Sequence, residues 1–200
     1  MKLEKHLVLN KYFLNLFGFD DFNELREKLM DKEEGYDSYG RSNFVDALIN
    51  LKNSQITEDQ LLRYDEAIRE YVEKLRQNRK QPNFNLKYFQ YLAVLFTEIF
   101  LDKYYNDKDG FIAELNEFLK EFNNENKTEN SLFTEEDLKK LAFWMATGSG
   151  KTLIMHINYW QILKYSKNNW DNIILITPNE GLSKQHYEEL KLSGIPCKLY

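Results

Sequence analysis

Apolar residues recur at helical spacing through the first part of the chain, up to about residue 122. In residues 2–17 they fall every three or four positions, which predicts an amphipathic helix ended by Gly18. Thr57 followed by Gln60 is the pattern of a capping box and predicts the start of a long charged helix that ends before Pro82. The same spacing predicts further helices at 22–32, 44–51, 86–105 and 111–122, so residues 1–139 form a mostly helical region.

Two short and continuous apolar runs follow the polar stretch at residues 123–131. Residues 141–145 and 173–176 are apolar throughout, which is typical of parallel strands buried on both faces. The segments 153–167 and 180–194 between and after them have helical spacing, and Gly194 is expected to cap the second. With a third strand beginning at residue 195, this order predicts the start of a doubly wound α/β domain at residues 140–200.

The sequence Thr-Gly-Ser-Gly-Lys-Thr at residues 147–152 joins the first apolar run to the helix after it. Two glycines permit a tight turn whose N–H groups point inward, and a helix start adds the positive end of its dipole. In such a phosphate-binding loop Lys151 contacts the β- and γ-phosphates, and the Thr152 hydroxyl binds Mg²⁺. The full pattern has a glycine where this chain has Met145. The alternative is an ordinary turn with a solvated lysine, which gives no reason for Lys and Thr to follow Gly-Ser-Gly.

The segments MATGSGKT and ITPNEGLSKQ together resemble motifs I and Ia of superfamily 2 helicases and translocases. A residue other than glycine at the place of Met145 is usual in that superfamily. Within it, the sequence is most similar to restriction-enzyme motor subunits of type III and type I systems, which have a DEAD/DEAH-type ATPase core. The resemblance covers residues 140–200, and it implies that they are the first part of a RecA-like lobe built on a parallel sheet.

The resemblance also implies roles for single residues. The ATP phosphates and Mg²⁺ would be held by Thr147, Gly148, Ser149, Gly150, Lys151 and Thr152, with Thr152 as the metal ligand. Motif Ia residues would lie against the sugar-phosphate backbone of DNA, and here they are Thr177, Pro178 and Asn179. The other interpretation is that Pro178 and Asn179 end a strand and cap a helix, and both can hold together.

Gln90 resembles the glutamine that reads adenine upstream of the phosphate loop in many superfamily 2 proteins. It follows an aromatic residue, Phe89, as in that element. The separation from Gly148 is longer than usual, however, and 102–137 would have to be an insertion. An ordinary polar position on an amphipathic helix is the alternative, and it is favoured because glutamines are common on helix surfaces.

The resemblance further implies residues that these 200 do not supply. Superfamily 2 motors hydrolyse ATP with an acidic DExx box on a later strand and with a second lobe. The Asp65–Glu66 pair lies upstream of the loop, in a charged helical segment. No catalytic residue is therefore assigned, and the chain is expected to be the N-terminal fragment of a longer ATP hydrolase and to be inactive alone.

Composition and charge bear on the location of the protein and on how it could contact DNA, and they leave this interpretation unchanged. The single cysteine, Cys197, excludes a disulfide framework within the chain and fits a reducing, cytoplasmic location. No apolar stretch is long enough to span a membrane. The net charge of −5 excludes a polybasic DNA-binding protein, although a local basic groove could still hold DNA.

Two hypotheses follow from the sequence. The first is a part of an ATP-dependent DNA helicase or translocase of restriction or phage-defence type, with DNA and a methyltransferase or specificity subunit as partners. The second is a non-catalytic module that binds nucleotide or docks another subunit through residues 1–139.

Overall fold

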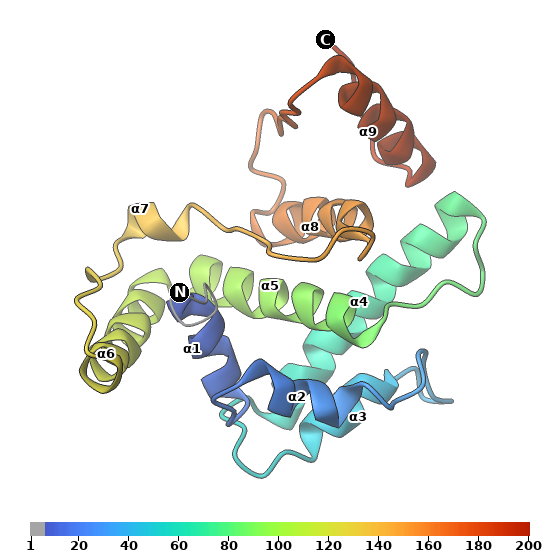
Figure 1. The fold of residues 1–200 in the computed structure, drawn as a ribbon. Coiled ribbons are helices and arrows are strands. Elements are labelled where there is room, and N and C mark those ends of the chain that lie inside the picture. The colour runs from blue at the N-terminus through green and yellow to red at the C-terminus, as the bar shows by residue number, and fades with distance from the viewer. Residues whose placement is uncertain (1–6) are drawn as a thin grey trace.

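Nine α-helices make up the regular structure of residues 7–200, the part of the chain that the computed structural model describes (Figure 1). Each of the eight longer helices corresponds to a segment for which the sequence predicts a helix. In chain order they are α1 Val8–Leu16, α2 Phe22–Leu29, α3 Asn43–Ile49, α4 Glu58–Arg79, α5 Tyr88–Asn106, α6 Lys108–Asn126, α7 Glu135–Leu138, α8 Lys151–Tyr165 and α9 Glu180–Leu192.

The helix ends follow the local sequence. At the start of α4 the Gln60 N–H donates to Thr57 Oγ1 over 3.3 Å, while Gln60 Oε1 accepts from the Thr57 N–H over 3.0 Å. This confirms the predicted capping box. At the other end Lys80 has φ 54°, so the helix ends at Arg79, three residues before Pro82.

Helix α5 is the centre of the helical body (Figure 1). It packs against α8 on one side and against α4, α2 and α6 on the others. Its side chains Val94, Leu95 and Ile99 are buried, as expected for a helix that is apolar on most sides. Ile154 and Ile157 of α8 join the same core cluster. The phosphate-loop helix is therefore anchored on the helical region.

The predicted parallel sheet is wrong for the described residues. Segments 141–145 and 173–176 have no regular structure and make no strand pairing. The isolated bridge between Tyr36 and Ser42 is the β contact in residues 7–200. Their apolar side chains are exposed, with Ile174 79% and Ile176 87% accessible. The α/β fold class therefore has to be corrected to all-helical for residues 7–200.

The physical reason is that a strand satisfies its N–H and C=O groups only through a neighbouring strand. In the described chain these two segments and residues 195–200 do not lie beside one another as a ladder. A helix instead forms its hydrogen bonds within one segment. The apolar pattern predicts that these segments prefer a strand conformation. It does not say which neighbouring strand each would pair with.

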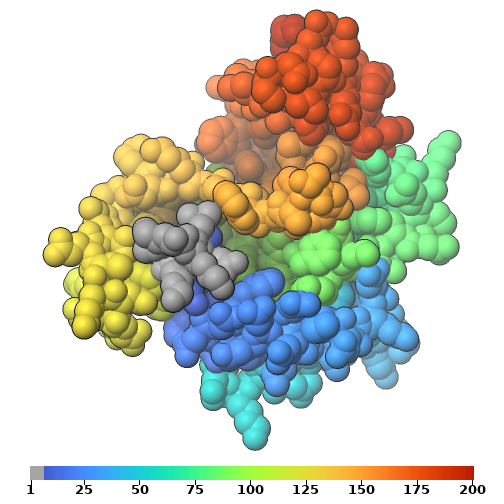
Figure 2. Space-filling view, viewed as in Figure 1, coloured from blue at the N-terminus to red at the C-terminus, as the bar shows by residue number. Residues whose placement is uncertain are grey.

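Helix α9 stands on top of the helical body as a separate lobe (Figure 2). It is tied to the C-terminal end of α4, where Arg79 Nη2 lies 2.6 Å from Glu189 Oε2 and Arg79 Nη1 donates to Ser193 Oγ over 2.9 Å. None of the residues of α9 is buried. Among the described helices, none has both the length and the apolar character needed to cross a membrane.

Candidate nucleotide-binding site

The turn at residues 147–150 has the backbone that its glycines predict. Gly148 and Gly150 have φ values of +77° and +85°, in the left-handed region that favours glycine. The Ser149 N–H closes the turn by donating to the Ala146 carbonyl over 3.3 Å. A Cβ atom on Gly148 would meet nothing within 4 Å, so this side of the turn faces open space.

The turn leads directly into the first residues of α8. The N–H groups of Leu153 and Ile154 donate to the Gly150 carbonyl, over 3.0 and 3.2 Å, and no side chain caps the helix. Within residues 7–200 the N–H groups of Gly148, Gly150, Lys151 and Thr152 have no acceptor. Unpaired donors at a helix start are suited to an anion, because the helix dipole adds to their positive potential.

Lys151 closes over its own loop. Its Nζ donates to the carbonyl oxygens of Met145, over 3.1 Å, and Ala146, over 2.7 Å. The side chain is exposed, so its ammonium group can turn away from these carbonyls at little cost when an anion offers a stronger partner. The charge therefore lies beside the unpaired N–H groups of the turn.

Gln90 is the sequence-predicted residue that the structure brings to the loop. Its Nε2 donates to the Ser149 carbonyl over 2.9 Å, and its Oε1 accepts from the Lys87 N–H over 2.9 Å. A Cβ atom on residue 150 would lie 2.4 Å from Gln90 Nε2, so this amide also explains why position 150 is a glycine. Residues 102–137 do not prevent the contact, because they form the end of α5, α6 and α7 and leave the N-terminal ends of α5 and α8 together.

A hollow of about 530 Å³ lies beside the loop. Its lining joins Lys151 and Thr152 to mostly apolar side chains, and the remaining residues are Phe143, Met145, Ile154, Met155, Asn158 and His186. No group of three or more His, Cys, Asp or Glu side chains in the described residues is arranged to hold a metal ion. The role of Thr152 as a Mg²⁺ ligand stays a prediction.

Thr177, Pro178 and Asn179 lie at the start of α9. Asn179 caps this helix, because its Oδ1 accepts from the Leu182 N–H over 2.9 Å. Thr177 Oγ1 donates to the Asn179 carbonyl over 3.1 Å and lies 2.6 Å from Ser183 Oγ. The predicted cap is confirmed, while the predicted contact with DNA stays a prediction.

Asp65 has a structural place in the helical body. Its buried carboxylate accepts from the Ser42 N–H over 2.9 Å and from the Tyr91 hydroxyl over 2.7 Å. Burial raises the pKa of Asp65, and these two donors oppose that rise. The carboxylate thus joins α4 to the loop before α3 and to α5.

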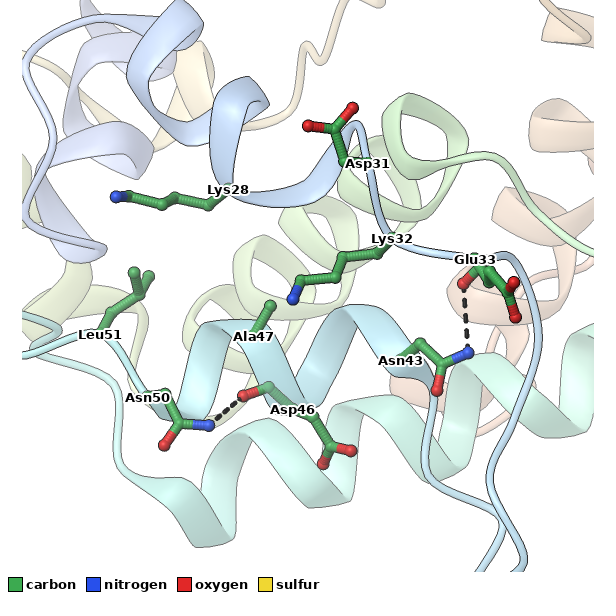
Figure 3. A pocket seen from close by; sticks show the side chains of 9 residues that line it. All are labelled: Lys28, Asp31, Lys32, Glu33, Asn43, Asp46, Ala47, Asn50 and Leu51. Atoms are coloured by element: carbon green, nitrogen blue, oxygen red, sulfur yellow. Dashed lines mark hydrogen bonds between the residues drawn. The ribbon is translucent and has the colours of Figure 1, made fainter.

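A second hollow, of about 630 Å³, lies between the end of α2 and helix α3 (Figure 3). Lys28 and Lys32 extend along it, and Asp31, Glu33 and Asp46 stand on its rim. The Asn43 side chain donates to the Glu33 carbonyl over 3.2 Å. Charges of both signs alternate here, so the lining favours neither an anion nor a cation. None of the sequence-predicted site residues lies in it.

The loop, the lysine and the helix start have the geometry expected of a phosphate-binding loop, and the binding itself stays a prediction. The comparison with known families is more specific, because the family described as type III restriction enzyme, res subunit, matches residues 65–198. The chain therefore belongs to this family of helicase-like restriction-enzyme subunits, which confirms the resemblance to superfamily 2 motors. No curated protein and no solved structure matches the chain.

The family match begins inside α4 and runs through α9. It thus includes α5 and Gln90 as well as the phosphate-loop segment. The sequence predicts a division between residues 139 and 140, and this division stays a prediction. Glu98 on α5 is a buried residue that the sequence analysis missed, and its position in an apolar helix was the available signal.

Proposed function

We propose that the chain binds ATP and Mg²⁺ through residues 147–152 and serves an ATP-dependent DNA helicase or translocase of restriction type. The observation that supports this most is the turn itself, with unpaired N–H groups at Gly148, Gly150, Lys151 and Thr152 beside the Lys151 ammonium group. Family membership supports the same activity for the protein as a whole, which we place in the cytoplasm.

In this proposal the backbone N–H groups hold the phosphates, and Lys151 leaves the Met145 and Ala146 carbonyls to contact them. Thr152 stands one residue further on α8 and lines the hollow beside the loop. There it would bind Mg²⁺, which when present neutralises phosphate charge.

Gln90 is proposed to read the adenine ring. Its amide makes one hydrogen bond through each end, to Lys87 and Ser149. An amide has two N–H donors and two acceptor lone pairs, so one donor and one acceptor remain. That pair matches the N6 and N7 edge of adenine, which glutamine contacts with two hydrogen bonds. The contact with Ser149 places this pair directly beside the phosphate loop.

Substitution of the loop lysine tests nucleotide binding. Lys151→Ala is expected to weaken binding of ATP by about tenfold or more, since a charge-assisted contact to phosphate is lost. Stability should be unchanged, because the side chain is exposed. Isothermal titration calorimetry with ATP and Mg²⁺ measures the affinity, and circular dichroism checks the fold.

Lys140→Ala is the matched control, since Lys140 is also exposed and precedes the site. Equal affinities for wild type, Lys151→Ala and Lys140→Ala would exclude the loop as the binding site. A loss of the same size in both variants would indicate a general effect of charge.

We further propose that the start of α9 contacts DNA and that a methyltransferase subunit is a partner, as the family implies. Thr177 Oγ1 donates to the Asn179 carbonyl, and Asn179 Oδ1 accepts from the Leu182 N–H. The N–H groups that precede Leu182 in the first turn would meet a phosphate. Thr177→Glu adds a negative charge there and should weaken DNA binding at low salt. Asn169→Glu adds the same charge at an exposed loop position and serves as control. Fluorescence anisotropy that shows equal binding by both would reject the contact.

A further inference from the structure

A fully buried carboxylate joins α5 to the phosphate-loop helix α8. Glu98 is 0% exposed, and its oxygens meet three side chains of α8. Gln161 Nε2 donates to Oε1 over 3.0 Å, while the Tyr165 hydroxyl donates to Oε2 over 2.7 Å. The Lys164 Nζ lies 3.3 Å from Oε2. Burial, together with the charge of Glu98, raises the pKa of Tyr165, so its phenol remains a donor.

This cluster is the second of two polar attachments between the same helices. The first is the bond from Gln90 to Ser149 beside the loop. Glu98 follows Gln90 by eight residues, about 12 Å along α5 at 1.5 Å per residue. Its partners at 161–165 also follow Ser149, by twelve to sixteen residues, so α5 and α8 run in the same direction with both N-terminal ends at the loop.

Two attachments on parallel helices fix how far one helix slides along the other. Apolar packing alone permits shifts of one helix past its neighbour, whereas hydrogen bonds to a buried carboxylate have defined length and direction. A displaced Glu98 would be a buried charge without donors, which is strongly unfavourable. Gln161 Nε2 also donates to the Val94 carbonyl over 3.0 Å, which adds a backbone anchor on α5.

We propose that Glu98 is a positioning residue that sets the register between α5 and α8, and thereby holds Gln90 at the place where it reads the base of a nucleotide bound in the loop. This inference rests on the proposed binding of ATP. Glu98 would thereby determine how much more tightly the site binds adenine nucleotides than ligands that consist of phosphates alone. Glu98 itself touches neither the base nor the phosphates.

The decisive measurement compares ATP with inorganic tripolyphosphate, which lacks the base. In Glu98→Gln the ATP affinity is expected to fall about tenfold while that of tripolyphosphate changes less than about twofold, because small misplacements of a binding group are costly. Tyr165→Phe, which removes one donor from the same cluster, should move the ratio of the two affinities in the same direction by a smaller factor. Both affinities are measured by calorimetry on the whole chain.

Asp102 and Tyr64 provide matched controls. Asp102 lies one turn after Glu98 on α5, but its carboxylate accepts from Tyr64 and Arg63 of α4, over 2.6 and 2.7 Å. Asp102→Asn and Tyr64→Phe therefore change equivalent groups without removing a hydrogen bond to α8. We expect them to leave the ratio of ATP to tripolyphosphate affinity unchanged. Hydrogen exchange without nucleotide should quicken at residues 153–156, whose N–H groups are hydrogen-bonded, in Glu98→Gln and not in Asp102→Asn.

The outcomes separate the two proposals. A fall in ATP and tripolyphosphate affinity by the same factor, or an equal change in the Asp102→Asn control, would overturn the positioning role while leaving ATP binding intact. A wild-type chain that fails to bind ATP, or that binds it unaffected by Lys151→Ala, would instead reject the proposed function. Hydrogen exchange is measured without nucleotide, so it tests the register role whether or not the chain binds ATP. Unchanged exchange in Glu98→Gln would reject that role.

Discussion

The phosphate-loop helix and the two apolar segments on either side of it contrast within one stretch of chain. Ile154 and Ile157 of α8 are buried in the core cluster with α5. Trp144, before the loop, and Ile176, after the helix, are 83% and 87% exposed. All four side chains are apolar, yet only the two on the helix are buried against another element.

The difference lies in what each kind of element needs. Helix α8 forms its backbone hydrogen bonds internally and requires only one apolar face to cover, which α5 supplies. An extended segment needs a neighbour for its backbone as well as cover for its side chains. Exposed apolar segments of this kind mark surfaces that associate with other protein.

The largest expected effect separates these two environments directly. Ile157→Ala should lower the free energy of unfolding by about 2–5 kcal/mol, since it opens a cavity in the core between α8 and α5. Ile176→Ala should change it by less than about 0.5 kcal/mol, because an exposed side chain has few contacts to lose. Urea unfolding followed by circular dichroism measures both.

Ile176→Ala is the variant that can contradict the contrast between buried and exposed apolar side chains. A loss near that of Ile157→Ala would mean that Ile176 is buried in solution, against a second copy or in a sheet. Repeating the measurement at several protein concentrations distinguishes these two cases, because burial between copies depends on concentration.

The sequence predicts the helices well because their signals are local. The capping box at Thr57 and the ends at Gly18 and Gly194 each depend on a few neighbouring residues. The strands at 141–145 and 173–176 were predicted by the same kind of pattern. That pattern contains no information on which segment pairs with which, and so the sheet was wrong.

The site shows the same division between local and distant information. The turn at 147–152 and the Asn179 cap lie in single short motifs and could be predicted. The approach of Gln90 to Ser149 joins residues 59 positions apart, and sequence spacing argued against it. Glu98 and Arg79 act across still longer separations, where no pattern along one helix identifies the partner.

A pH titration tests the contact between α8 and the α9 lobe. His156 of α8 is buried, and its Nδ1 lies 2.8 Å from Ser193 Oγ. Burial, together with the nearby charge of Arg79, lowers the pKa of His156 to about 4. The unfolded chain, with an ordinary pKa of about 6.5, therefore takes up a proton before the folded chain does.

The stability that this histidine contributes is present above pH 6.5 and is lost as the pH falls towards 4. The expected slope is at most about 1.4 kcal/mol of unfolding free energy per pH unit. The variant His156→Gln removes the titrating group, so its stability should fall less steeply over this range. Parallel curves for wild type and His156→Gln would show that the histidine is solvated in the folded chain.

Two glycines of the loop allow a smaller and more local comparison. Alanine at either position is strained by the positive φ, which costs roughly 1 kcal/mol. At residue 150 the added Cβ would also lie 2.4 Å from the Gln90 amide, whereas at residue 148 it meets open space. Gly150→Ala should therefore destabilise the chain more than Gly148→Ala, by thermal unfolding. Gly150→Ala in a Gln90→Ala background should recover the difference, and failure to recover it would show that the two groups do not meet.

The smallest effect compares the caps of α4 and α9. Thr57→Ala removes a capping box from a helix with many buried residues, and should lower the global unfolding free energy by about 1 kcal/mol. Asn179→Ala removes an equivalent cap from α9, none of whose residues is buried. Loss of this cap should quicken hydrogen exchange at residues 180–183 and change global stability by less than about 0.5 kcal/mol, because the start of α9 opens without the core. An Asn179→Ala variant as destabilised as Thr57→Ala would mean that α9 folds cooperatively with the helical body, through the contacts of Arg79 with Glu189 and Ser193.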